Sequence, residues 1–96
     1  MKLYNPSLQI INGNPAVSYY DITNNIKFIR SNTTTGSVWG TPITIDSLGS
    51  VGQYTSLQVV DGNPAISYSN LSTGDLKFAR FALTPVEINY TAMNPQ

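Results

Sequence analysis

The sequence predicts an all-β fold: two four-stranded antiparallel blades of a β-propeller. Three observations predict it. One stretch of the chain occurs twice, each copy holds four short runs of alternating apolar and polar residues, and turn-forming residues separate those runs. No apolar period of 3.6 residues persists for ten residues, so we expect no helix.

The repeat is visible along most of the chain. Residues 7–19, SLQIINGNPAVSY, return at 56–68 as SLQVVDGNPAISY, and IKFIR at 26–30 returns at 76–80 as LKFAR. TPITID at 41–46 resembles TPVEIN at 84–89. Four-stranded units that recur every 40–50 residues are typical of propeller blades. We therefore assign 7–46 to blade 1, 47–55 to an inter-blade linker, 56–90 to blade 2 and 91–96 to a C-terminal tail.

Each predicted blade has four strands in chain order. The first ends at Asn12-Gly13 or Asp61-Gly62, dipeptides that strongly favour a tight hairpin. Polar turns end the second strand, and Lys-Phe lies within the third. The predicted strands are Leu8–Ile11, Ala16–Tyr20, Ile26–Arg30 and Val38–Ile45 in blade 1, and Leu57–Val60, Ala65–Ser69, Leu76–Arg80 and about Val86–Tyr90 in blade 2.

Alternation within the second strand predicts that sheets stack. Val17 and Tyr19 place bulky side chains on one face, while Ala16 and Ser18 place small ones on the other, so neighbouring sheets can nest. Two blades cannot close a ring, because propellers typically have four to eight. We expect a homo-oligomer and favour a trimer with six blades over a tetramer with eight. A lone two-sheet sandwich and a piece of a longer propeller are the alternatives.

Composition excludes several functions. The chain has no cysteine and no histidine, which removes disulfides, thiol nucleophiles, and the commonest general base and metal ligand. Five basic and five acidic residues cancel, so neither nucleic acid nor an anionic membrane is an expected partner. No apolar run reaches 18 residues, and the N-terminus carries no signal-peptide pattern. We expect no metal and no cofactor, and the cellular compartment stays open.

The motifs resemble a known type of repeat. Gly-Asn-Pro-Ala-Val/Ile-Ser-Tyr, followed by the Lys-Phe strand and by Trp39-Gly-Thr-Pro, is similar to bacterial proteins with sialidase-type (BNR, or Asp-box) propeller blades. NTTTGSVW at 32–39 keeps Gly36 and Trp39 of the Asp-box but has Thr34 for its Asp and Asn32 for its Ser/Thr. The resemblance implies a structural role for this motif. The expected assembly is similar to small fucose-binding lectins whose two-bladed chains trimerise.

We expect non-catalytic carbohydrate binding, because no two acidic residues are placed as a glycosidase pair. Aromatic rings stack on sugar faces while neighbouring polar groups bind hydroxyls. The alternatives are a structural or protein-interaction scaffold without a small ligand, and a remnant of a sialidase-like glycosidase. Each candidate also has a structural interpretation: the tyrosines as core, the cations as strand ends or partners of Asp, the tryptophan as a fold element. The candidate binding residues are Trp39, Tyr19, Tyr68, Lys27, Lys77, Arg30 and Arg80.

Overall fold

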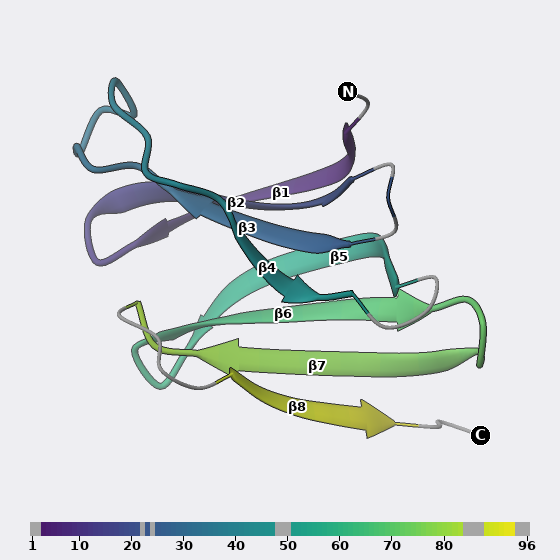
Figure 1. Ribbon diagram of the computed structural model, residues 1–96. Helices are drawn as coiled ribbons and strands as arrows, with labels where there is room; N and C mark the ends of the chain where they lie inside the picture. Colours follow the sequence, from purple (N-terminus) through teal and green to yellow (C-terminus); the bar gives the residue numbers. More distant parts are fainter. Residues whose placement is uncertain (1–2, 22, 24, 48–50, 84–87, 94–96) are drawn as a thin grey trace.

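The computed structural model describes residues 3–21, 23, 25–47, 51–83 and 88–93. In these ranges the chain forms two four-stranded antiparallel sheets and no helix, which confirms the all-β prediction (Figure 1). Each sheet follows chain order. Sheet 1 contains β1 (Leu3–Ile11), β2 (Asn14–Asp21), β3 (Ile26–Arg30) and β4 (Ile43–Asp46); sheet 2 contains β5 (Val51–Val60), β6 (Asn63–Asn70), β7 (Asp75–Phe81) and β8 (Ile88–Met93).

The first hairpin of each sheet turns as its sequence predicts. Asn12 and Gly13 both have positive φ, 48° and 83°, and Asp61 and Gly62 repeat this with 51° and 78°. A two-residue turn with both central residues in the left-handed region matches the twist of the strands that it joins. The turns set the same register in both copies, so Leu8 pairs with Val17 and Leu57 with Ile66.

The first strands are longer than predicted because a bulge lets pairing continue. Asn5 in β1 and Tyr54 in β5 have φ of 52° and 60°, at the register shifts between Tyr4 and Ser7 and between Gln53 and Ser56. The extra residue at a bulge breaks the alternation without ending the ladder. As a result, β5 begins at Val51, inside the segment 47–55 that we assigned to a linker.

The fourth strands differ from their expected bounds. β4 begins at Ile43 rather than Val38, because residues 32–42 leave the sheet edge and return through a single bridge between Ser31 and Trp39. β8 runs to Met93, past the predicted Tyr90 and into the predicted tail, while Val86 lies outside the described residues.

The register also separates the two Thr-Pro segments. Phe28 pairs with Ile43, and its repeat equivalent Phe78 pairs with Thr91. Ile43 and Thr91 are therefore equivalent, although the sequence likeness aligns Ile43 with Val86. Strand pairing, and not the shared Thr-Pro, decides which residues correspond.

The two sheets pack face to face, and the core lies between them (Figure 1). Phe28 of sheet 1 meets Phe81 of sheet 2 edge to face, with ring centroids 4.9 Å apart. Polar contacts cross the same interface: Ser18 Oγ donates to Thr55 Oγ1 at 3.1 Å. The buried core residues are Ile11, Ala16, Ile26, Phe28 and Ile45 from sheet 1, and Leu57, Ile66, Tyr68, Ala79 and Phe81 from sheet 2.

Within the described ranges no helix is long and apolar enough to cross a membrane.

Candidate functional site

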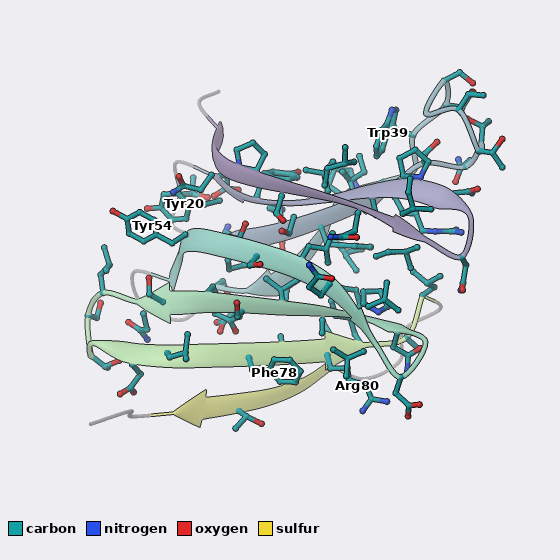
Figure 2. All side chains as sticks on the ribbon, turned by 180° about the vertical axis from the view of Figure 1, so that it is seen from behind. Tyr20, Trp39, Tyr54, Phe78 and Arg80 are labelled. Atoms are coloured by element: carbon teal, nitrogen blue, oxygen red, sulfur yellow. The ribbon has the colours of Figure 1, made fainter. Side chains whose placement is uncertain are left out.

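Trp39 and Tyr19, both predicted to bind a ligand, line one shallow depression of about 400 Å³ together with Pro6, Val17 and Ile29. We call this depression the apolar surface. Val17 pairs with Ile29 across β2 and β3, so both side chains lie on the same face of sheet 1. Figure 2 shows Trp39 on the side of sheet 1 that faces away from sheet 2. The apolar surface therefore belongs to the outer face of sheet 1.

The Trp39 ring is held in place by the 32–42 segment. Its Nε1 donates to the carbonyl oxygen of Gly36 at 2.8 Å. Gly36 has φ of 78°, a backbone conformation that favours glycine, and a side chain at this position would lie at ordinary contact distance from Pro15 and the indole. The buried hydroxyl of Ser31 donates to the carbonyl oxygen of Val38 at 3.0 Å, which closes the segment. The indole remains 38% exposed, so it serves both as a fold element and as accessible surface.

Tyr19 and Lys27 form the polar edge of the apolar surface. They are direct partners across β2 and β3, so they share a face. The Nζ atom of Lys27 donates to Thr44 Oγ1 at 2.8 Å. Partial burial raises the pKa of the Tyr19 hydroxyl, and the negative charge of Asp21 raises it further. Tyr19 therefore stays a neutral hydrogen-bonding group at physiological pH.

Tyr68 and Lys77 occupy the same repeat positions as Tyr19 and Lys27 but lie in the interface between the sheets. Tyr68 is 1% exposed and donates its hydroxyl to Asp46 Oδ2 at 2.6 Å. The Nζ atom of Lys77 reaches the same oxygen at 2.6 Å and lies 5.8 Å from the centroid of the Tyr68 ring. In the second copy this pair therefore joins the sheets and lies away from the apolar surface.

The two arginines lie on the other face of their sheets. Arg30 donates from Nε to the carbonyl oxygen of Ile11 at 3.0 Å and from Nη2 to that of Asn12 at 3.1 Å, which ties β3 to the first hairpin. Arg80 lies 3.6 Å from the exposed Asp61 carboxylate, and its buried Nε has no hydrogen-bond partner among the described residues. Neither arginine contributes to the apolar surface.

The carboxylates near this region are engaged in structural contacts. Asp21 Oδ1 accepts hydrogen bonds from the backbone and hydroxyl of Thr23 and from the backbone of Asn25. Burial alone would raise the pKa of Asp21, but these hydrogen bonds and the charge of Lys27 lower it overall. No group of three or more His, Cys, Asp or Glu suited to a metal occurs in the described part of the chain. The arrangement supplies apolar area and aromatic rings.

Sequence reasoning missed Leu8 and the aliphatic lining of the apolar surface, although the repeat carried a signal for them. Leu8 is 64% exposed, while its repeat equivalent Leu57 is fully buried. Val17 is half-buried, and its equivalent Ile66 is fully buried. The outer face of sheet 1 thus has apolar residues whose repeat equivalents in sheet 2 are buried.

The inner face of sheet 1 and the outer face of sheet 2 show the reverse. Here the residue in sheet 1 is buried, and its repeat equivalent in sheet 2 is exposed or half-buried. Ile26 is fully buried against sheet 2, whereas its equivalent Leu76 is 38% exposed on the outer face of sheet 2. Phe28 is buried, and Phe78 is half-buried. Each end of the two-sheet stack therefore exposes a leucine, Leu8 or Leu76, whose repeat equivalent is buried in the middle of the stack.

Comparisons of this chain with models of protein families, with curated proteins and with solved structures found no match.

Proposed function

We propose that the chain is a non-catalytic interaction module that completes a β-propeller with copies of itself. One observation carries the proposal: the outer face of sheet 1 contains the repeat equivalents of residues on the face of sheet 2 that sheet 1 covers. The pairs Leu8–Val17 and Leu57–Ile66 have the same register, but only the second pair is buried. A further sheet on sheet 1 would remove the same apolar side chains from water.

A closed ring would cover the outer face of sheet 1 and the outer face of sheet 2 in every copy. Added copies give each outer face a neighbour, and rotational symmetry ends the addition when the ring closes. Three chains would supply six blades, within the four to eight that propellers typically have. The low proportion of charged residues, 10% of the chain against about 25% in typical soluble domains, fits a molecule with much of its surface in contacts.

Native mass spectrometry of the full chain tests the proposal. We expect an intact complex of three chains at micromolar concentration, each of 10.5 kDa. Four chains would keep the ring and change its blade number. A single chain across the whole concentration range would contradict self-assembly.

Carbohydrate binding is the second candidate, and the position of Trp39 beside Tyr19 favours it. An exposed indole and a neutral tyrosine hydroxyl, with Lys27 next to it, suit a sugar ring that stacks on one face and offers hydroxyls at its edge. A second copy would cover this same surface. A glycan therefore needs a chain in which the apolar surface remains open.

A glycan array tests this candidate in two forms of the protein, the wild type and Leu76→Glu, which alters only the outer face of sheet 2. Binding that Trp39→Ala abolishes, in a protein with an unchanged circular dichroism spectrum, supports a lectin-like function. Trp39 is compared with Leu71→Ala, which removes an exposed apolar side chain in the β6–β7 turn. No signal from either form across the array would contradict carbohydrate binding.

A further inference from the structure

We infer that copies associate head to tail: the outer face of sheet 2 of one copy docks on the outer face of sheet 1 of the next. This inference rests on the proposed self-assembly and identifies the two surfaces and their direction. In this arrangement, the contact between two copies is equivalent to the contact between sheet 1 and sheet 2 within one chain.

The strand register supplies the first argument. Within the chain, the face of sheet 1 that meets sheet 2 contains the cross-strand row Ser7, Ser18 and Phe28. The outer face of sheet 2 contains the equivalent row Ser56, Ser67 and Phe78, paired in the same register. The outer face of sheet 2 therefore has serine and phenylalanine at the same register positions as the face of sheet 1 that packs against sheet 2.

A second row extends this equivalence. Ala16 pairs with Arg30 on the inner face of sheet 1, and Ala65 pairs with Arg80 on the outer face of sheet 2. The small alanine and serine side chains of β6 would meet the bulky Val17 and Tyr19 of the next copy, in the way that Ala16 of β2 shares the buried core between the sheets with Ile66 and Tyr68. Figure 2 shows Phe78 and Arg80 on sheet 2, and Trp39 at the far side of sheet 1. The docking surfaces thus lie at opposite ends of the stack.

A symmetric contact between two sheet-1 faces fits less well. It would oppose bulky residues to bulky ones, and it would bring Lys27 of both copies into one interface. Like charges that face each other in an interface are unfavourable. A contact between two different surfaces has neither conflict, and it repeats around an axis until the ring closes.

One contact of the interface within the chain is not repeated between copies. Asp46, which accepts from Tyr68 and Lys77, pairs with Ile26 in sheet 1. The residue that pairs with the equivalent Leu76 in sheet 2 is Met93. Lys27 of the next copy therefore meets no carboxylate at this position. We expect the contact between copies to depend on apolar burial and to respond little to salt.

Mixing two single-face variants tests the direction of assembly. Leu8→Glu places a charge on the outer face of sheet 1, and Leu76→Glu places one on the outer face of sheet 2. Both residues are exposed in the single chain, so neither change buries a charge in its core. The matched control is Leu71→Glu, an exposed leucine in a turn and on neither face. Sedimentation velocity measures the mass of each variant and of an equimolar mixture.

We expect each face variant alone to sediment as a single chain and the control to assemble like the wild type. The mixture should form a one-to-one complex, because one intact face of each kind remains. Self-association of Leu76→Glu alone, or a mixture that stays as single chains beside an assembled wild type, would overturn the direction. A wild type that is itself a single chain would instead refute the proposed self-assembly. If Leu8→Glu does not fold, Ile10→Glu on the same face, 58% exposed, replaces it.

Discussion

Tyr68 donates its hydroxyl to Asp46 Oδ2 at 2.6 Å across the interface between the two sheets. The Nζ atom of Lys77 reaches the same oxygen at the same distance, and the side chains of Lys77 and Asp46 are 12% and 3% exposed. One carboxylate on β4 thereby holds side chains of β6 and β7. The contact joins the last strand of the first repeat to the middle of the second, so it couples the two sheets directly.

Removing the Asp46 carboxylate should destabilise the fold. In Asp46→Ala, Lys77 loses the Asp46 carboxylate in a largely buried site, and breaking a buried ion pair typically costs about 3–5 kcal/mol in the free energy of unfolding. The control is Asp61→Ala, whose ion pair with Arg80 is exposed and should contribute less than about 1 kcal/mol. Urea unfolding at one protein concentration measures both. Equal effects of the two changes would contradict the structural role of Asp46.

Leu8 and Leu57 should respond differently to the same substitution. In a Leu76→Glu background, which we expect to keep the chain single, Leu57→Ala should lower the free energy of unfolding by about 2–5 kcal/mol, because it leaves a cavity in the core. Leu8→Ala in that background should change it by less than about 0.5 kcal/mol, since the side chain is exposed. Thermal and urea unfolding provide the measurement. A large loss for Leu8→Ala would show that something within the single chain already covers this leucine.

Met93→Asp should strengthen the contact between copies. It places a carboxylate at the register position that Asp46 occupies in sheet 1. In the proposed arrangement this position lies opposite Lys27 of the next copy. We expect a lower dissociation constant at low salt, and a loss of the gain when Lys27→Ala is added. Sedimentation equilibrium in low and high salt measures both effects. A weaker assembly, or a gain that survives Lys27→Ala, would contradict the head-to-tail arrangement.

Asp21 should make the stability depend on pH in acid. Its pKa in the folded state is lowered below the value near 3.9 of an unfolded chain, so its contribution is present above that value. It is lost as the pH falls through the folded-state pKa. The stability advantage of the wild type over Asp21→Asn should therefore be largest at pH 7 and shrink below about pH 4. Urea unfolding at several pH values measures it. A constant difference between pH 7 and pH 2.5 would show that the carboxylate charge contributes nothing.

Strands β2 and β3 could be predicted because local chemistry determines them. Alternation fixes their two faces, and Asn12-Gly13 fixes the turn before β2 through backbone conformations that few other dipeptides adopt. The early parts of β1 and β5 could not be predicted, because the bulges at Asn5 and Tyr54 interrupt the alternation on which the reasoning depends. The start of β4 could not be predicted, because it depends on pairing with β3. The sequence does not show which residues of the two strands pair.

The aromatic residues of the candidate site could be predicted from the sequence, but their surroundings in the structure could not. Trp39 and Tyr19 could be chosen by residue type, but their proximity depends on how residues 32–42 fold over β2 and β3. Tyr19 and Tyr68 lie in nearly identical sequences and differ only in what covers them. The sequence of a repeat does not show which of its copies lies at the end of a stack of sheets. That position decides whether a residue lies in the core or on the surface.

Sedimentation equilibrium of the wild-type chain over a dilution series, beside Leu8→Glu at the same concentrations, tests self-assembly most directly. We expect a wild-type mass of about three times 10.5 kDa at micromolar concentration, and a mass of one chain for the variant. A wild type that remains a folded single chain at every concentration would contradict it.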